Sequence, residues 1–158
     1  MRVLTRRSLL STTGVNEMRV SELTGHALDW AVAKCEGATE FWFDTIATYW
    51  VTLHGRDRAL SKGWAQSFTP STNWAQGGPI IEREEFTLSH SPYEHVFYGR
   101  ARPWCAEKRG VMEYGPTPLI AAMRCYVASK LGDEVEIPAE LLTKEKFNKE
   151  EPTLTHRR

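Results

Sequence analysis

Residues 68–82 read FTPSTNWAQGGPIIE, and this mixture of small, polar and turn-forming residues predicts a loop around which the chain is organised. Pro70 fixes one backbone angle, and the short polar side chains that follow it bond readily to nearby backbone. The Gly-Gly-Pro run at 77–79 predicts a sharp change of direction and lets another group approach the backbone closely. One large aromatic residue, Trp74, stands in this loop. We interpret it either as a plug for the core or as a platform for a ligand.

The length and the charge of the chain limit the classes of protein to which it can belong. The chain has 158 residues, which suits one domain with a single core. Lys and Arg total 20, and Asp and Glu also total 20, so the formal net charge is zero. A nucleic-acid coat requires a clear basic excess, so nucleic acid is a disfavoured partner. Six tryptophans provide large surfaces for burial or for stacking.

The three cysteines, Cys35, Cys105 and Cys125, are odd in number and have no CxxC spacing. The sequence therefore predicts neither a disulfide framework nor a zinc site, and a reducing compartment is the simplest setting. Cys35 and Cys125 fall at apolar positions of predicted helices, and we interpret both as small buried hydrophobes.

No apolar run approaches the roughly 20 residues that span a bilayer, so no membrane partner is predicted. Residues 5–10, TRRSLL, look like a twin-arginine export signal. Such a signal continues into an apolar region of about 7–15 residues, whereas residues 11–17 are polar and end in Glu17. We therefore reject export. Residues 1–17 are interpreted as a loosely ordered extension ahead of Met18.

Residues 23–37 have the pattern of a helix. Thr24 is its predicted N-cap, and Gly37 is placed to end it. The apolar face recurs at helical spacing and consists of Leu28, Ala31, Val32 and Cys35.

Residues 117–132 give the clearest helical pattern in the chain. Thr117 is a predicted N-cap, Pro118 takes the first helical position, and Gly132 ends the helix. Its apolar stripe consists of Leu119, Ile120, Met123, Val127 and Leu131. Alanines widen this stripe and allow close packing.

Strands are predicted between these helices. Residues 39–53 are rich in aromatic and β-branched types, which favours two short strands, although the same residues also fit a helical stripe. Residues 54–64 form a basic connection that contains Arg56 and Arg58. It is either a solvated loop or a set of cations near an anionic ligand.

Residues 80–88 and 94–100 are predicted to be the two strands of a hairpin, followed by a loop over 99–113. Residues 133–142 form a short coda with a final turn from Pro138, and 143–158 are expected to be a mobile charged tail.

The predicted fold class is therefore α+β, with both helices packed on one face of a small, mostly antiparallel sheet. We expect a single domain over residues 18–142.

Four pieces of the chain carry a resemblance: SELTG at 21–25, LDWAVAK at 28–34, PSTNWAQGGPIIE at 70–82 and GPTPLIAAMRCYVA at 115–128. Together they resemble the NinX-like family of tailed phages over about residues 18–142. Residues 39–66 and 88–113 match little of that pattern. The resemblance implies a phage accessory protein made in the cytoplasm of an infected bacterium, and it supplies no catalytic residues.

The residues themselves do not predict an enzyme. The sequence contains no P-loop, GxSxG or HExxH motif and no paired metal-ligand spacing, so no cofactor, metal or catalytic residue is predicted.

Three functional hypotheses remain. The first is a non-catalytic binder of a small nucleotide-like molecule, such as one that sequesters a host defence signal. The second is a protein-interaction module that inhibits a host or phage enzyme, and the third is a nucleic-acid accessory factor. A homo-oligomer is compatible with each hypothesis.

The first hypothesis names a binding site. A planar base stacks on Trp74, and the backbone N–H groups of Gly77 and Gly78 meet an anion. Neighbouring polar groups and cations complete the predicted site, which also contains Ser71, Thr72, Asn73, Arg56, Arg58 and Arg83.

Overall fold

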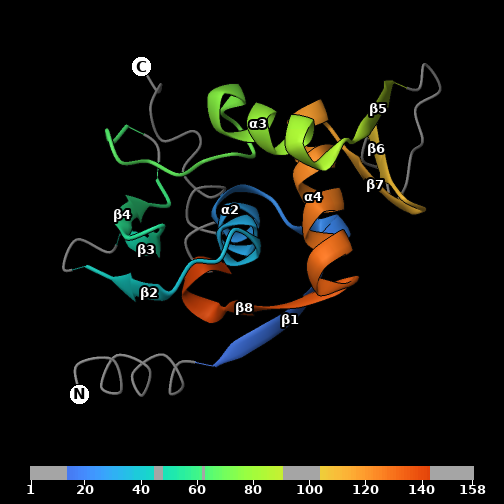
Figure 1. Ribbon diagram of the computed structural model, residues 1–158. Helices are drawn as coiled ribbons and strands as arrows, with labels where there is room; N and C mark the ends of the chain where they lie inside the picture. Colours follow the sequence, from blue (N-terminus) through green and yellow to red (C-terminus); the bar gives the residue numbers. More distant parts are fainter. Residues whose placement is uncertain (1–13, 45–47, 62, 91–103, 143–158) are drawn as a thin grey trace, which may run out of the picture.

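The computed structural model describes residues 14–44, 48–61, 63–90 and 104–142. The chain has an α+β fold, as predicted, and its helices and strands are shown in Figure 1. In chain order the elements are β1 (Val15–Arg19), the 3-10 helix η1 (Val20–Glu22), α2 (Gly25–Cys35), β2 (Glu40–Phe43), β3 (Tyr49–Leu53), β4 (Arg56–Ala59), α3 (Trp74–Glu84), β5 (Thr87–His90), β6 (Trp104–Lys108), β7 (Val111–Gly115), α4 (Pro118–Leu131) and β8 (Glu134–Pro138).

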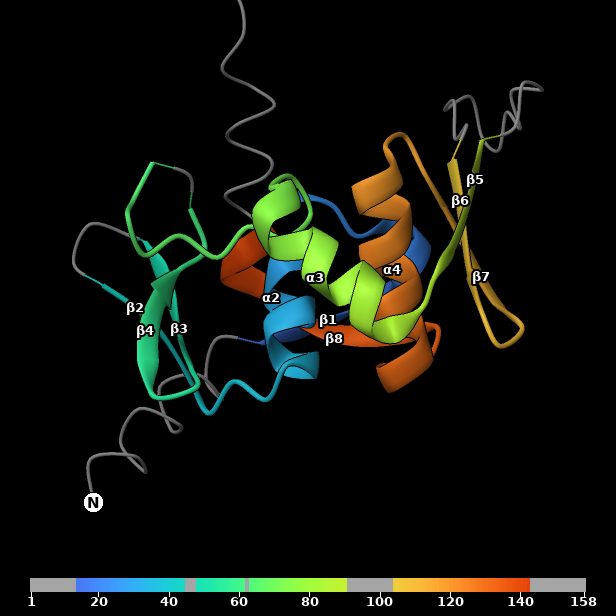
Figure 2. The ribbon, with the colours of Figure 1, turned by 45° about the horizontal axis from the view of Figure 1, so that its top comes forward.

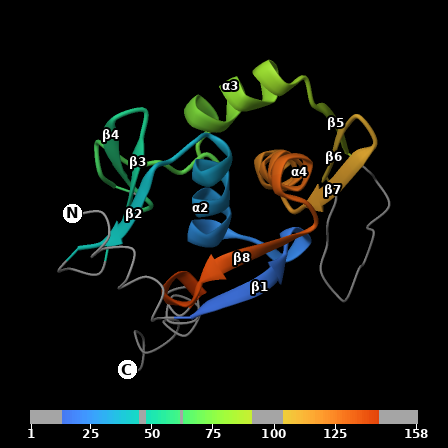
Figure 3. The ribbon, with the colours of Figure 1, turned by 60° about the horizontal axis from the view of Figure 1, so that its bottom comes forward.

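The described strands form three small antiparallel sheets, where a single sheet was expected. One sheet pairs β1 with β8, the second has the order β2-β3-β4, and the third has the order β5-β6-β7. The sheets lie on different sides of the α2 and α4 pair, and the β1–β8 pair runs beneath both helices (Figure 3). Because the strands have only four or five residues, each sheet covers one part of this helical centre.

The core is centred on α2 and α4, and both of these helices were predicted. Thr24 and Thr117 occupy the N-cap positions, and the Thr117 hydroxyl accepts a hydrogen bond from the Ile120 N–H at 3.2 Å. α4 is buried around most of its circumference, which is why small residues and Cys125 lie among its larger apolar side chains. Buried Arg124 donates from Nε to the Leu23 carbonyl and from Nη1 to the Tyr114 carbonyl.

The prediction for residues 74–84 was wrong, because this segment is helix α3 instead of a loop followed by a strand. α3 lies across α2 and α4 (Figure 2). Gly77 faces the interior, where an added Cβ would lie 2.5 Å from the Pro70 carbonyl oxygen and 2.6 Å from Leu119 Cδ2. The glycine that suggested a turn therefore permits close packing of a helix, and this packing outweighs a weak local helix propensity.

Three strands form where loops were predicted. β4 lies in the basic connection, β6 lies in the 99–113 segment and β7 begins there, whereas the predicted strands β2 and β3 are confirmed. In each new hairpin a short turn places two residues at positive φ: His54 and Gly55 before β4, and Arg109 and Gly110 before β7. Backbone pairing across such turns accommodates charged strands that have one solvated face.

The strand expected over residues 80–88 begins only at Thr87, because α3 continues to Glu84 and Glu85 ends it with a left-handed conformation. The predicted strand at 94–100 and the predicted tail at 143–158 lie outside the described residues.

The fold includes residues that precede Met18. β1 begins at Val15 and pairs with β8 in the register Val15↔Pro138 to Arg19↔Glu134, so residues 15–17 belong to the fold. Residues 139–142, which follow β8, are helical. Among the described helices, none is long and apolar enough to cross a membrane.

Candidate functional site

Trp74 lies at the surface. It is the first residue of α3, and 55% of it is exposed. Its ring lies over Gly78, where an added Cβ would be 3.9 Å from Trp74 Cε3. The interpretation of Trp74 as a plug for the core is therefore wrong, and the interpretation as a platform for a ligand remains.

A groove of about 430 Å³ opens beside Trp74. It is lined by Gly63, Trp64, Ser67, Thr69, Thr72, Asn73 and Trp74. Two large indoles with open surface thus border one groove, since Trp64 is 43% exposed. None of these lining residues carries a charge.

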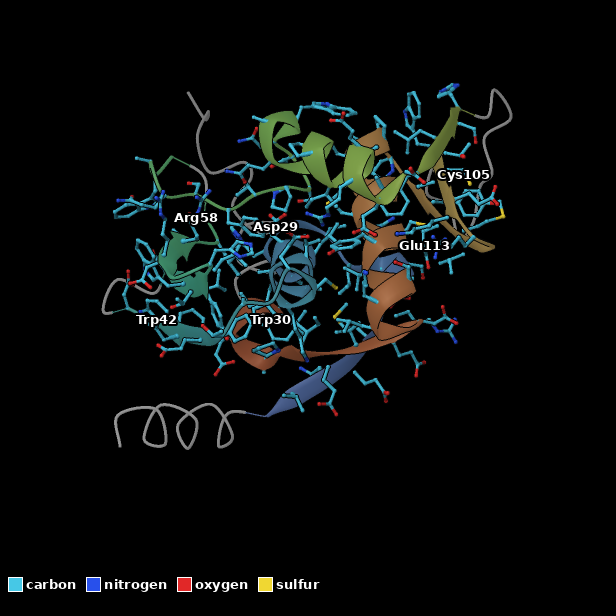
Figure 4. The ribbon with its side chains drawn as sticks, in the orientation of Figure 1. Asp29, Trp30, Trp42, Arg58, Cys105 and Glu113 are labelled. Atoms are coloured by element: carbon cyan, nitrogen blue, oxygen red, sulfur yellow. The ribbon has the colours of Figure 1, made fainter. Side chains whose placement is uncertain are left out.

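Trp64 was not predicted to belong to the site. Its ring meets Trp50 edge to face with centroids 5.8 Å apart, and Trp50 lies nearly parallel to Trp42 at 6.4 Å. The Trp50 indole also donates to Asp44 Oδ2 at 2.7 Å. Trp50 lies on β3, the middle strand of the β2-β3-β4 sheet. Figure 4 labels Trp42 on one edge strand, β2, and Arg58 on the other, β4. The sequence did contain a signal for Trp64. It follows a glycine in a polar connecting segment, where a large aromatic side chain is seldom part of the core.

Ser67 holds the turn that carries Trp64. Its hydroxyl lies 2.5 Å from the Ser61 carbonyl oxygen and accepts a hydrogen bond from the Trp64 N–H at 3.1 Å. The Ser67 carbonyl accepts from Arg58 Nη2 at 2.9 Å and from Gln76 Nε2 at 2.7 Å. Arg58 therefore supports the groove through the backbone and does not line it.

Gln76 is a second residue that the sequence analysis missed. In addition to the bond to Ser67, its Oε1 accepts from the Thr69 N–H at 2.7 Å. The Gln76 side chain thus connects the first turn of α3 to Ser67 and Thr69, which both line the groove. No pattern in the sequence indicates this role, because both partners lie in irregular backbone.

The polar residues of the predicted site have separate positions. Ser71 is buried, and its N–H donates to Asp29 Oδ1 at 2.9 Å, so it anchors the loop to α2. Thr72 is exposed and lines the groove. Asn73 also lines the groove, and its side chain accepts from the Ala75 N–H as the N-cap of α3.

Gly77 and Gly78 do not form an open pair of backbone donors. The Gly77 N–H donates to the Asn73 carbonyl at 2.9 Å, and Gly78 lies inside α3, where N–H groups serve the helix. The anion-binding role predicted for these N–H groups requires a loop, and the helix removes that loop.

The three predicted arginines do not converge on Trp74. Arg56 is exposed at the start of β4, and Arg58 supports Ser67. Arg83 is near the other end of α3, about 13 Å from Trp74 along the axis at 1.5 Å per residue. There its guanidinium pairs with Glu36 and Glu84, and the hydrogen bond to Glu36 raises the pKa of Arg83 further.

The partners of Arg83 belong to a charged cluster that joins α2, α3, α4 and β6. Its members are Glu36, Arg83, Glu84, Lys108, Tyr126 and Lys130. The Tyr126 hydroxyl donates to Glu36 Oε1 at 2.7 Å, and Lys108 bonds to Glu84. The hydrogen bond from Lys108 is the main reason that the pKa of Glu84 is lowered. Because every carboxylate here has a cationic partner, the cluster is suited to holding α3 in place.

No metal centre is formed by the part of the chain that the structure describes, since no three His, Cys, Asp or Glu residues there are arranged to hold an ion.

Comparison with known proteins gives one family. The family described as "Bacteriophage P22, NinX" matches residues 19–130. No curated protein matches the chain. The matched range extends from the end of β1 to the last turn of α4 and contains the groove and all of α3.

Proposed function

Since the chain belongs to the family of bacteriophage P22 NinX, as its sequence predicted, we propose that this phage accessory protein binds a small nucleotide-like molecule without chemical turnover. The observation that carries the proposal is the pair of exposed indoles, Trp64 and Trp74, on one groove. Exposed tryptophan is costly to leave in water, and an aromatic platform beside a concave surface is a common way to hold a planar ring.

The size of the groove supports a ligand of this class. Its volume of about 430 Å³ lies within the usual range of small-molecule sites, roughly 300–1,000 Å³. Stacking of one base on an aromatic side chain contributes about 1–3 kcal/mol. Thr69, Thr72 and Asn73 add polar groups beside the rings, and such groups fix the orientation of a ligand.

The chemistry of the lining favours binding over catalysis. The described lining residues include no histidine and no carboxylate that could act as a general base. The Ser67 hydroxyl already bonds within its own turn, and no described lining residue is a base that could activate it or the hydroxyls of Thr69 and Thr72. In the cytoplasm of an infected bacterium, binding without turnover would lower the free concentration of a host defence signal.

A second function rests on the same indoles. Tryptophan is enriched among the residues that dominate protein interfaces, so Trp64 and Trp74 could dock a protein and inhibit a host or phage enzyme. The two functions differ in whether a small molecule alone produces a shift in the melting temperature.

The test is to screen the whole protein against nucleosides, nucleotides, cyclic dinucleotides and ADP-ribose derivatives by thermal shift. Each ligand that raises the melting temperature is then incubated with the protein, released by heat and identified by mass spectrometry. We expect unchanged ligand, up to one equivalent per chain. Trp64→Ala and Trp74→Ala should abolish the shift, whereas Met112→Ala, at an exposed residue of β7, should keep it.

Two results would overturn the proposal. An altered product in excess of one equivalent would show an enzyme. No shift with any compound, together with capture of a partner protein that depends on both indoles, would favour the interaction module.

A further inference from the structure

We propose that Asn73 reads an acceptor atom on the edge of the bound ring, so that the groove recognises the uncharged heterocycle of a nucleobase and leaves its phosphates in solvent. This inference rests on the proposed function and specifies its ligand. It replaces the expectation that cations and backbone N–H groups meet an anion.

The orientation of the Asn73 amide is fixed by its cap. The Ala75 N–H can only donate, so the side-chain atom 3.0 Å from it is the oxygen, Oδ1. Nδ2, with two donor hydrogens, is therefore the other branch of the amide. Within the described residues Nδ2 has no hydrogen-bond acceptor, although Asn73 lines the groove beside Trp74.

This donor matches the edge of a nucleobase. Ring nitrogens and carbonyl oxygens of bases are acceptors, and asparagine is among the side chains that bond to such edges. A ring that stacks on Trp74 lies next to the residue that precedes Trp74 in the chain. The exposed Thr72 hydroxyl, which can donate or accept, borders the same groove.

The lack of charge on the described lining residues argues against recognition of phosphate. All described lining residues are uncharged. Of the predicted cations, Arg58 bonds to the Ser67 carbonyl, and Arg83 is bound by Glu36 and Glu84 at the far end of α3. A phosphate attached to the base would therefore gain no ion pair from the described lining residues and is better placed in water.

The test uses Asn73→Asp in the whole protein. Aspartate caps helices as well as asparagine does, so α3 and the melting temperature should be retained. The substitution replaces the Nδ2 donor with an acceptor oxygen, so binding of the preferred nucleoside should fall about tenfold or more, as expected when a hydrogen-bonded pair is replaced by two acceptors. Asn16→Asp, at an exposed residue of β1, is the matched control because it makes the same chemical change outside the groove.

The ligands are the four common ribonucleosides, their 5′-monophosphates and inorganic phosphate, measured by calorimetry at low and at high salt. We expect a nucleoside and its monophosphate to bind with similar affinity, with little effect of salt and no binding of phosphate alone. A monophosphate that binds about tenfold more tightly than its nucleoside, and loses this advantage in high salt, would overturn the inference and leave the proposed function intact. Wild-type affinity in Asn73→Asp would refute the role of Asn73. Failure of all nucleosides and nucleotides to bind would instead count against the proposed function.

Discussion

The carboxylate of Asp29 accepts a hydrogen bond at 2.9 Å from the backbone N–H of Ser71, which lies 42 residues further along the chain. Both residues are buried, with 3% and 1% of their surface exposed. Asp29 lies on α2 at the centre of the molecule (Figure 4). The bond fixes the loop from Phe68 to Asn73 against α2, and it thereby fixes the start of α3 and one wall of the groove.

We expect Asp29→Ala to destabilise the protein by about 1–3 kcal/mol, because the Ser71 N–H then remains buried without an acceptor. Asp29→Asn keeps an oxygen acceptor and should lose less. Urea unfolding of both variants measures the difference. Equal stability of the alanine and asparagine variants would mean that this bond contributes nothing.

The two neighbouring glycines of α3 should respond differently to substitution. In Gly77→Ala the new methyl group meets the Pro70 carbonyl and Leu119, so we expect a loss of about 1–3 kcal/mol from overpacking. Gly78→Ala makes an ordinary contact with Trp74 and should stabilise α3 by up to about 1 kcal/mol. The measurement is thermal unfolding of the two variants side by side. A larger loss in Gly78→Ala would show that α3 is placed incorrectly.

Trp74→Ala should change the free energy of unfolding by less than about 1 kcal/mol, because more than half of the residue is exposed. The matched comparison is Trp30, which is 6% exposed in α2 and should lose about 3–5 kcal/mol when replaced by alanine. Chemical denaturation of both variants tests the assignment. If Trp74→Ala lowered the free energy of unfolding as much as Trp30→Ala does, Trp74 would have to be part of the core.

The charged cluster predicts a pH dependence of stability. The pKa of Glu84 is lowered below its ordinary value of 4.5, mainly by Lys108, so the folded state binds the proton of Glu84 less tightly than the unfolded state does. The stabilisation that ionised Glu84 contributes is therefore complete above pH 4.5, and it disappears as the pH falls through the pKa of Glu84 in the folded state. Glu84→Gln should be less stable than the wild type near pH 7, and the two should converge in acid. A constant difference in stability from neutral to acidic pH would contradict this role of Glu84.

The thiols of Cys35 and Cys125 should react slowly in the folded protein. Burial is the largest cause that raises the pKa of each thiol to about 12, so almost no thiolate is present at pH 8. We expect iodoacetamide to label both residues only after urea is added, as measured by peptide mass spectrometry. Rapid labelling of Cys125 without urea would show that α4 opens in the native state.

The sequence identified elements whose signals are local. Thr117 with Pro118 at the start of α4, Thr24 before α2, and the aromatic and β-branched run that became β2 and β3 each lie within the element that they specify. These signals were sufficient for the α+β class and the central helices. The four sequence pieces were also sufficient for the family.

The residues of the groove illustrate the opposite case. Trp64 and Gln76 lie at positions without a periodic pattern, and they join the site only because the turn held by Ser67 meets the first turn of α3. Arg83 is a residue that the sequence placed in the site incorrectly. It lies nine residues after Trp74 on the same helix, and this spacing separates it from the groove.

By itself the sequence thus determined the two central helices, the antiparallel pairing and the family, because caps, stripes and matching pieces are properties of adjacent residues. Only the tertiary structure decided that residues 74–84 are a helix and that Trp74 faces solvent. The reason is that a glycine is equally suited to a turn and to a tight helix contact, and the contacts that choose between them come from Leu119 and from Asp29, which are distant along the chain.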